Sequence, residues 1–164
     1  MPRSSKSSRL KLRLVALGHK LPAWANAAFG EYARRLPREF TLELVELKPG
    51  ARDTGKSAAQ ILAAEAARIA AACAGLDIVA LDEQGEMWTT ARFSQCLGEW
   101  RDEARAIAFV IGSADGLDPQ ITRRAHVRLS LSAMTLPHAL ARVVLAEQVY
   151  RAVSVLQGHP YHRE

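Results

Sequence analysis

Glycines, leucines and small polar residues that could bind a nucleotide-like ligand follow three strand-like stretches of the sequence. The stretches end near Leu81, Ile111 and Leu131, and Gly112 and Gly116 follow the second of them. The carboxyl ends of parallel strands meet at one edge of a sheet, where ligands of open α/β folds bind. Glycine lets the backbone approach a ligand closely, and apolar side chains can enclose an adenine whose edge bonds to main-chain groups. The candidate wall residues are Leu81, Ile111, Leu131, Met134 and Leu136.

A second stretch has the letters of a phosphate-binding loop. Gly50–Ser57 reads GARDTGKS, lies between an expected strand and an expected helix, and precedes an apolar strand that ends in Asp82-Glu83. However, the strand before it carries Glu43 and Glu46 on one face, whereas the strand that feeds such a loop is normally central and buried. We therefore interpret residues 48–55 as a solvent-exposed basic connection and keep a P-loop-like nucleotide-binding protein as an alternative. No Gly-x-Gly-x-x-Gly motif follows the first strand, which argues against a dinucleotide fold.

The expected last helix, from about 138 to 156, carries polar residues on an otherwise apolar surface. Glu147 and Arg151 are four residues apart and share a stripe, and Arg142 lies on another side. The pair is either an intrahelical ion pair or part of a polar strip that lines a site at a subunit boundary. Because the helix is apolar on more than one face, we expect the sheet to cover one side and a second subunit another. The spacing alone favours the ion pair.

Strand-like and helix-like stretches alternate along the chain, which predicts an α/β domain with a mainly parallel sheet and helices on both faces. A turn is expected at Gly85, and Thr135 is expected to cap the last helix ahead of Pro137. Strands are expected at residues 10–17, 41–47, 77–81, 106–111 and 129–132. Helices are expected from Pro22, from Ser57 to about 74, from Thr89 or Thr90, from Asp118-Pro119 to about 125, and from 138 to 156.

Length and composition indicate one domain in a protein without a membrane span. The 164 residues can bury a real core, and a composition of 49% hydrophobic and 24% charged residues is ordinary for a globular protein. The first nine residues are basic and serine-rich, and the charge alternation after them is unlike a signal peptide. We expect residues 1–9 to form a disordered tail, residues 10–164 to form one domain, and the protein to be cytoplasmic.

The cysteines and the net charge bear on metals and partners. Cys73 and Cys96 lie on separate expected helices without the spacing of metal ligands, so we expect two packing residues and no metal site. The net charge is +5 and the isoelectric point is about 9.6. A basic protein attracts polyanions at low salt, which favours nucleic acid as the partner.

Three C-terminal segments carry specific motifs: residues 129–138 (LSLSAMTLPH), 142–152 (RVVLAEQVYRA) and 158–163 (GHPYHR). They closely resemble the RlmH family, the bacterial large-subunit rRNA methyltransferases of the SPOUT superfamily. The resemblance covers almost the whole chain from Leu10, including residues 12–18, Leu81-Asp82 and the loop at Ile111-Gly112. The chain departs from the family at Ser113-Ala114-Asp115, where relatives usually carry a second glycine, and at Glu86, where a lysine is common.

The resemblance implies a SPOUT fold with a C-terminal trefoil knot, an obligate homodimer and S-adenosylmethionine as methyl donor. It implies methyl transfer to N3 of a pseudouridine in 23S rRNA within the assembled 70S ribosome. Carried over by position, the residues that hold the cofactor would be Leu81, Gly112, Leu131, Ser132, Ala133, Met134, Thr135 and Leu136.

For that reaction, an in-line methyl transfer needs positioning and removal of the N3 proton. His162 or His138 could accept the proton, and Tyr161 could stack on a base. Arg142, Arg151 and Arg163 could hold phosphate or base oxygens. The tail has no evident anchor, so we expect it to complete the site of the partner subunit. A non-catalytic RNA-binding protein with this fold stays an alternative. The candidate catalytic residues are His162, Arg163, Tyr161, His138, Arg142 and Glu147.

Overall fold

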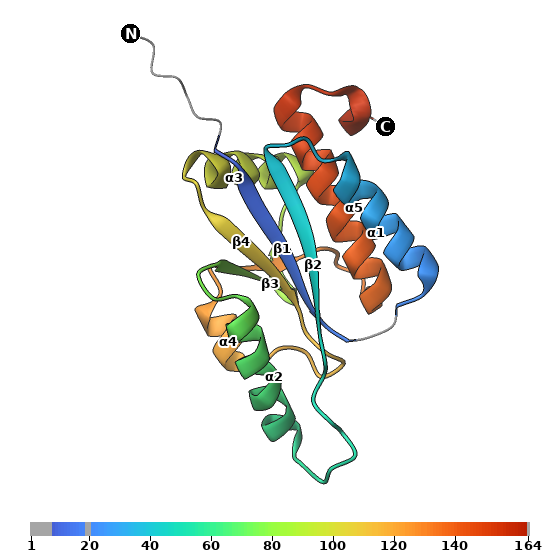
Figure 1. Cartoon of the computed structure of the whole chain (residues 1–164), viewed down its shortest axis with the longest axis vertical. Coiled ribbons are helices and arrows are strands. Elements are labelled where there is room, and N and C mark those ends of the chain that lie inside the picture. Colours follow the sequence, from blue (N-terminus) through green and yellow to red (C-terminus); the bar gives the residue numbers. More distant parts are fainter. Residues whose placement is uncertain (1–7, 19–20, 164) are drawn as a thin grey trace.

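The computed structural model describes residues 8–18 and 21–163, and the strands in these residues form one five-stranded parallel sheet (Figure 1). The order across the sheet is β2-β1-β4-β3-β5, and every neighbouring pair is parallel. The predicted α/β fold with a parallel sheet is therefore confirmed, and the knot stays a prediction. The strands are β1 (Leu10–Leu17), β2 (Phe40–Leu47), β3 (Asp77–Met87), β4 (Ala106–Ile111) and β5 (Val127–Ser130).

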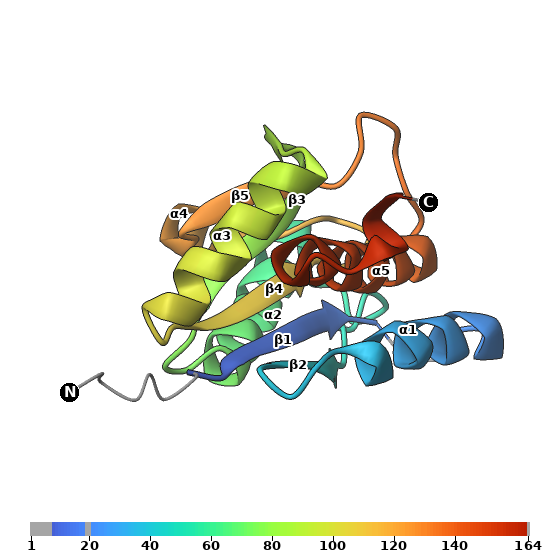
Figure 2. The same ribbon diagram turned by 90° about the horizontal axis from the view of Figure 1, so that it is seen from above.

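Helices cover both faces of the sheet, as predicted (Figure 2). Helices α1, α3 and α5 pack on one face, and α2 and α4 pack on the other. Side-chain caps start three of them, because Ser57, Thr89 and Asp118 each accept a hydrogen bond from a backbone N–H of the first turn. The bounds are α1 (Ala23–Arg35), α2 (Ala58–Ala72), α3 (Thr90–Asp102), α4 (Pro119–Arg124), α5 (His138–Gln157) and a 3₁₀ helix, η1 (Pro160–Arg163).

Strand β4 and the second half of β1 are apolar on both faces, as expected of strands in the interior of a parallel sheet. In β1, Leu12 and Leu14 join the core under α1, α3 and α5, whereas Val15 and Leu17 join the core under α2 and α4. Strand β2 is an edge strand, and both of its glutamates are exposed. They lie on opposite faces and not on one face as predicted, because strand side chains alternate: Glu43 pairs with Arg13, whereas Glu46 lies beside Arg142 of α5. A P-loop normally follows a central strand, so this edge position argues against the phosphate-loop reading of residues 50–57.

Strand β3 is longer than predicted, and the expected turn at Gly85 is a bulge inside it. Leu81 and Glu86 both lie opposite Leu129 of β5, so residues 82–85 bulge out of the ladder at the sheet edge. A Cβ on Gly85 would lie 2.6 Å from the backbone carbonyl of Arg128. Glycine at this position therefore marks a close approach of two backbones, which the sequence does not distinguish from a turn.

The predicted start of the last helix and the predicted last strand are also corrected. Strand β5 begins at Val127, two residues early, because Val127 pairs with Val79. Residues 131–136 then form a loop, and the N-cap of α5 is Pro137 without any side-chain cap bond, so the cap predicted for Thr135 is wrong. The α5 helix instead begins with the backbone amide of Ala141 bonded to the carbonyl of Pro137.

The cysteines and the N-terminal residues add to this picture. Cys73 and Cys96 are buried and free, as expected of packing residues, and burial raises the pKa of the Cys73 thiol to about 11. Ser8 and Arg9, which the sequence assigns to the tail, hydrogen-bond to the carbonyls of Arg101 and Arg38, and residues 1–7 lie outside the described residues. Within the described part of the chain, no helix is long and apolar enough to cross a membrane.

Replacing Gly85 by alanine tests the bulge. The added methyl group would collide with the Arg128 backbone, so we expect Gly85→Ala to lower the free energy of unfolding by about 1–3 kcal/mol in urea titrations. Gly30→Ala in α1 is the control, because its methyl group would meet only the tip of Arg34, and removing a mid-helix glycine stabilises by about 0.5–1 kcal/mol. Equal stability of Gly85→Ala and the parent would contradict the close approach.

Candidate functional site

One cavity of about 830 Å³ opens at the carboxyl ends of the strands. Its walls are the bulge of β3 and the loops that follow β1, β2, β4 and β5, together with the start of α5. A volume of this size suits a ligand of nucleoside dimensions with an extension. The loops at the ends of β3, β4 and β5 thus line one pocket, as predicted. The residues of the predicted cofactor set that line the cavity are Leu81, Gly112, Leu131, Ser132, Met134, Thr135 and Leu136; Ala133 does not line it.

The loop after β4 is closed on itself at the floor of the cavity. The amide of Gly116 donates to the carbonyl of Ser113 at 2.9 Å, and these two residues form an isolated antiparallel bridge. A Cβ on Gly112 would collide with the carbonyl of Gly116, and Gly116 has a φ of +82°. Both positions need glycine, so the loop keeps one tight shape against any ligand in the cavity.

The loop after β5 is held by serine side chains. The Ser130 hydroxyl donates to the carbonyl of Ser132 at 2.9 Å, and the Ser132 hydroxyl accepts from the amide of Met134 at 2.9 Å. These local bonds turn the chain so that Leu131 and Leu136 face the cavity. The side chain of Met134 is 79% exposed at the mouth, where a ligand or a second molecule would cover it.

The bulge of β3 places a carboxylate at the cavity rim. Asp82 accepts from both Nε and Nη2 of Arg128, at 3.1 and 2.6 Å, and from the amide of Gln84 at 2.9 Å. Burial raises the pKa of Asp82, but these hydrogen bonds outweigh it and leave the pKa below its ordinary value. Near neutral pH the rim therefore carries a charged Asp82 carboxylate whose charge is balanced by the Arg128 guanidinium.

His138, at the start of α5, is the one predicted catalytic residue on the cavity wall among the described residues. Its Nε2 contacts the carbonyl oxygen of Gly112, so α5 is tied to the loop after β4. If Nε2 carries the proton of that bond, Nδ1 is the remaining acceptor, and it lies on the side of Gly18. Burial lowers the pKa of His138, the bond to Gly112 opposes this, and the positive charge of Arg142 adds to the lowering.

Arg142 lies behind His138 and does not line the cavity. Its side chain is only 1% exposed, and its Nη1 lies 3.4 Å from the Glu46 carboxylate of β2. Among the described residues, its three guanidinium nitrogens have no hydrogen-bond partner. In this position Arg142 acts on the pocket through the charge it places beside His138.

The C-terminal tail is anchored, contrary to the sequence expectation. Tyr161 of η1 packs on Tyr150 with ring centres 4.6 Å apart, and its hydroxyl donates to Glu147 at 3.3 Å. Arg151 bonds the same carboxylate at 2.7 Å and lies over the Tyr161 ring. The predicted ion pair of Glu147 and Arg151 is therefore confirmed, and it also fastens the tail. Burial, followed by hydrogen bonding to Tyr32, raises the pKa of Tyr161.

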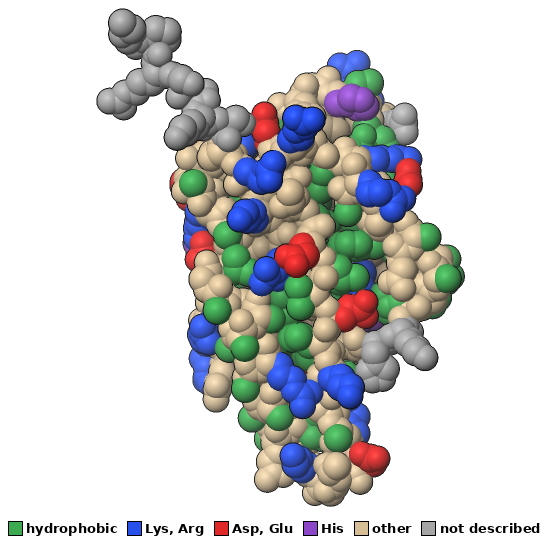
Figure 3. Space-filling view, viewed as in Figure 1, with side chains coloured by type: hydrophobic (Ala, Val, Ile, Leu, Met, Phe, Trp, Pro, Cys, Tyr) green, Lys and Arg blue, Asp and Glu red, His purple; other side chains and the backbone are tan. Residues whose placement is uncertain are grey.

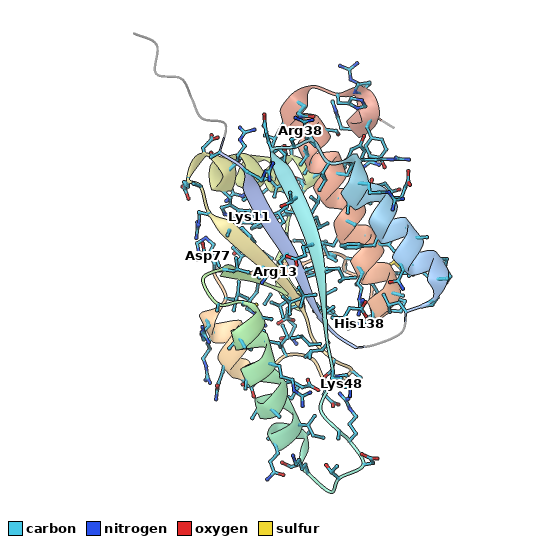
Figure 4. All side chains as sticks on the ribbon, in the orientation of Figure 1. Lys11, Arg13, Arg38, Lys48, Asp77 and His138 are labelled. Atoms are coloured by element: carbon cyan, nitrogen blue, oxygen red, sulfur yellow. The ribbon has the colours of Figure 1, made fainter. Side chains whose placement is uncertain are left out.

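The two groups of predicted catalytic residues lie at opposite ends of α5 (Figures 1 and 4). The helix has 20 residues, which at 1.5 Å per residue makes it about 30 Å long. His138 is at its first residue, on the cavity, whereas Tyr161, His162 and Arg163 follow its last turn. The tail folds back along the helix as far as Glu147, nine residues or about 13.5 Å from His138, and within one chain none of its three residues lines the cavity.

Comparisons with known proteins show the family to which the chain belongs. A family model described as "Predicted SPOUT methyltransferase" matches residues 10–162. The chain belongs to the SPOUT methyltransferase family. It is 52% identical over 155 residues to "Ribosomal RNA large subunit methyltransferase H" of Burkholderia ambifaria, and 51% identical to the protein of that name from Nitrosospira multiformis; each match covers 94% of this chain and 99% of the relative.

Solved structures support the fold alone. A putative methylase family protein from Neisseria gonorrhoeae superposes with a TM-score of 0.52 at 13% identity, over 87% of this chain and 82% of that one. The SPOUT membership that the sequence motifs predicted is thus confirmed from the sequence relatives, and the likeness in three dimensions agrees with the parallel sheet. Among the described residues, no group of three or more His, Cys, Asp and Glu is placed to hold a metal ion.

Sequence reasoning missed the part of this methyltransferase's cavity that comes from residues 49–52. Residues 51–55 are exposed, as predicted for this connection, but Pro49 and Arg52 also line the cavity, and Gly50 is buried. Arg52 bonds Asp115 through Nε and Nη2 at 3.1 and 2.9 Å, across the cavity wall. The one local sign of this arrangement in the sequence is Gly50, because a glycine permits the close packing on α2 that holds the loop here. The phosphate-loop pattern contains the same glycine for a different reason, the approach of the backbone to a phosphate.

The lowered pKa of His138 predicts a pH dependence of stability. A histidine with a lowered pKa binds fewer protons when folded than when unfolded, so its contribution is present above its ordinary pKa of 6.5 and is lost as the pH falls below it. We expect the loss of unfolding free energy between about pH 7.5 and about pH 5.5 to be smaller in His138→Gln than in the parent. Identical losses, measured by urea unfolding at each pH, would show that His138 is not titrating in this way.

Proposed function

We propose that this protein is an S-adenosylmethionine-dependent methyltransferase that modifies N3 of a pseudouridine in 23S rRNA of the assembled ribosome. The observation that carries the proposal is the cavity at the strand ends of a SPOUT chain that aligns along almost its entire length with large-subunit rRNA methyltransferases. We propose that it acts in the cytoplasm as a homodimer.

The residues of the cavity suit an adenosine-containing methyl donor. Leu81, Ile111 and Leu131 supply apolar walls for a purine ring, and the tight backbone around Gly112 lets main-chain groups approach its edge. When bound, S-adenosylmethionine supplies an electrophilic methyl group on a sulfonium. The chain's own contribution is to hold that donor in one orientation and to keep the loops around it closed.

The proposed division of labour between the two histidines follows from their contacts. Because Nε2 of His138 contacts the Gly112 carbonyl, we propose that His138 positions the loop after β4. His162 has a buried Nδ1 without a hydrogen-bond partner among the described residues. We favour His162 over His138 as the group that accepts the N3 proton, because His138 is committed to the Gly112 carbonyl, and we assign Arg163 to holding the RNA. Since Nδ1 of His162 is buried, the accepting nitrogen would be Nε2.

A homodimer resolves the separation between cavity and tail. A second copy that packs antiparallel along α5 would bring its tail to the cavity of the first. The outer surface of α5 carries apolar side chains that water should not favour, with Leu140 41% and Val155 36% exposed, and Met134 lies exposed beside the cavity. The Glu147–Arg151 pair lies between these apolar residues along the same helix, so in the proposed dimer it would lie near the subunit boundary.

The charge of the protein supports an RNA substrate without defining where it docks. The net charge of +5 attracts a polyanion, but lysines and arginines are scattered over the visible face and mixed with acidic side chains (Figure 3). A substrate within an assembled particle would supply shape as well as charge, so a concentrated basic patch is not required.

The decisive experiment uses labelled S-adenosylmethionine with ribosomes from a strain that lacks the modification. We expect label in 23S rRNA of intact ribosomes, located at N3 of one pseudouridine by nuclease mapping and mass spectrometry. Free 23S rRNA is the control for the requirement for assembly. Stoichiometric binding of S-adenosylmethionine with no transfer to any ribosomal particle would instead support a non-catalytic RNA-binding protein.

A complementation experiment tests the shared site. Thr135→Trp fills the cavity from an exposed loop, and the double variant His162→Ala, Arg163→Ala removes the tail chemistry; we expect each to be inactive alone. Co-expression gives heterodimers in half of the pairs, each with one intact site, so activity should return to about a quarter of the parent value. Purified heterodimers without activity would show that the tail serves its own subunit, and a monomeric mass in solution would exclude the shared site.

A further inference from the structure

A single buried carboxylate lies between two walls of the cavity. Glu65 is in the middle of α2, and its side chain is only 1% exposed. Its Oε1 accepts from the backbone amide of Gly50 at 2.9 Å, and its Oε2 accepts from the hydroxyl of Ser113 at 2.8 Å. Nη2 of Arg52 lies 3.8 Å from Oε1. Burying a charged group is costly unless it is hydrogen-bonded, so these contacts are the reason the carboxylate is tolerated there.

The two partners of Glu65 belong to two loops that lie side by side in the cavity wall, the loop after β2 and the loop after β4. Gly50 adjoins Pro49 and Arg52, and Ser113 lies within the tight loop between Gly112 and Gly116; these neighbours all line the cavity. Glu65 itself does not line it. It therefore has no direct access to a ligand, and anything it does for binding must pass through the loops.

Gly50 owes its identity to this arrangement. A Cβ at position 50 would lie 2.6 Å from Cγ2 of Ile61 and 3.5 Å from the Glu65 carboxylate, so only glycine lets the chain press against α2 at this point. The backbone amide that a phosphate-binding loop would offer to a nucleotide is here offered to the chain's own carboxylate. The glycine at position 50 is thus explained by packing on α2, without a phosphate ligand.

The departures of this chain at positions 113 and 115 fit the same network. Ser113 supplies the hydroxyl that Glu65 accepts, and Asp115 supplies the carboxylate that Arg52 binds. On the opposite side of the loop, His138 contacts the Gly112 carbonyl. The loop after β4 is therefore held from α2 and from α5 at once, at adjacent residues.

We propose that Glu65 is a positioning residue for the methyl-donor site, whose buried carboxylate fastens the loops after β2 and β4 into one preformed wall. The inference rests on the proposed function, because it deepens the role of the same cavity. A wall that is preformed raises affinity, since the apparent dissociation constant is the intrinsic one divided by the fraction of molecules in the binding-competent shape. The network acts before the donor binds, so it should alter KM for the donor and leave kcat nearly unchanged.

Ser113→Ala is the test variant, because it removes one hydrogen bond to the carboxylate with little change in volume. We expect it to weaken S-adenosylmethionine binding about tenfold by calorimetry, as for loss of a hydrogen bond to a charged group. KM for the donor should rise in parallel, while kcat and KM for ribosomes stay within about twofold. Without any ligand, the Gly116 amide, which bonds the Ser113 carbonyl, should exchange its hydrogen faster than in the parent.

Two further variants separate positioning from general destabilisation. Glu65→Gln keeps an acceptor for Gly50 and a group that can donate to Ser113, so it should bind the donor close to the parent value, whereas Glu65→Ala should bind at least as weakly as Ser113→Ala. Ser57→Ala is the matched control, since it removes a hydroxyl of the same size from the cap of the same helix. It should lower the unfolding midpoint without changing donor affinity.

Different results would overturn the proposed function and the positioning role of Glu65. A parent protein that binds no S-adenosylmethionine and methylates no ribosome removes the proposed function. A parent that is active, with unchanged donor affinity and amide exchange in Ser113→Ala and Glu65→Ala, overturns the positioning role alone. Donor affinity that falls equally in Ser57→Ala would also overturn it, because the effect would then follow the stability of α2.

Discussion

The common direction of the five strands is the constraint on which the site depends. In a parallel sheet every strand delivers its following loop to the same edge, so three segments far apart in the sequence meet without any long excursion of the chain. The central strands β1 and β4 are held by apolar contacts on both faces, which fixes the edge from which those loops leave. The cavity is the consequence of that edge.

The loops themselves are shaped by a few short-range polar contacts and by glycine. His138 holds the Gly112 carbonyl from α5, Glu65 holds Ser113 from α2, and the collision that a side chain at Gly112 would cause excludes other residues there. Each of these polar groups is buried and would cost free energy if it lost its hydrogen-bond partner, so the contacts hold the loops in one defined shape. This order before binding suits a reaction in which the donor must be aligned rather than chemically activated.

The length of α5 decides how the chemistry is distributed. The helix spans about 30 Å, with the cavity at one end and the tail at the other, and Tyr161, Glu147 and Arg151 fix the tail where it is. The tail residues are therefore presented on an ordered surface, where a partner molecule would meet them already in place. In the proposed homodimer, a site completed by two copies would tie activity to assembly.

The sequence by itself determined the α/β class and most strand positions, because these follow from periodicity. Contiguous motifs determined the family, and seven of the eight residues that the family resemblance assigned to the cofactor line the cavity. Tertiary structure alone decided that Gly85 is a bulge rather than a turn, since a glycine gives the same signal for both, and that the tail is anchored. It alone joined residues 49–52 to the cavity through Glu65, and buried Arg142 behind His138. Such contacts link side chains from different elements, and no local pattern of residues encodes which distant loop a carboxylate on a helix will meet.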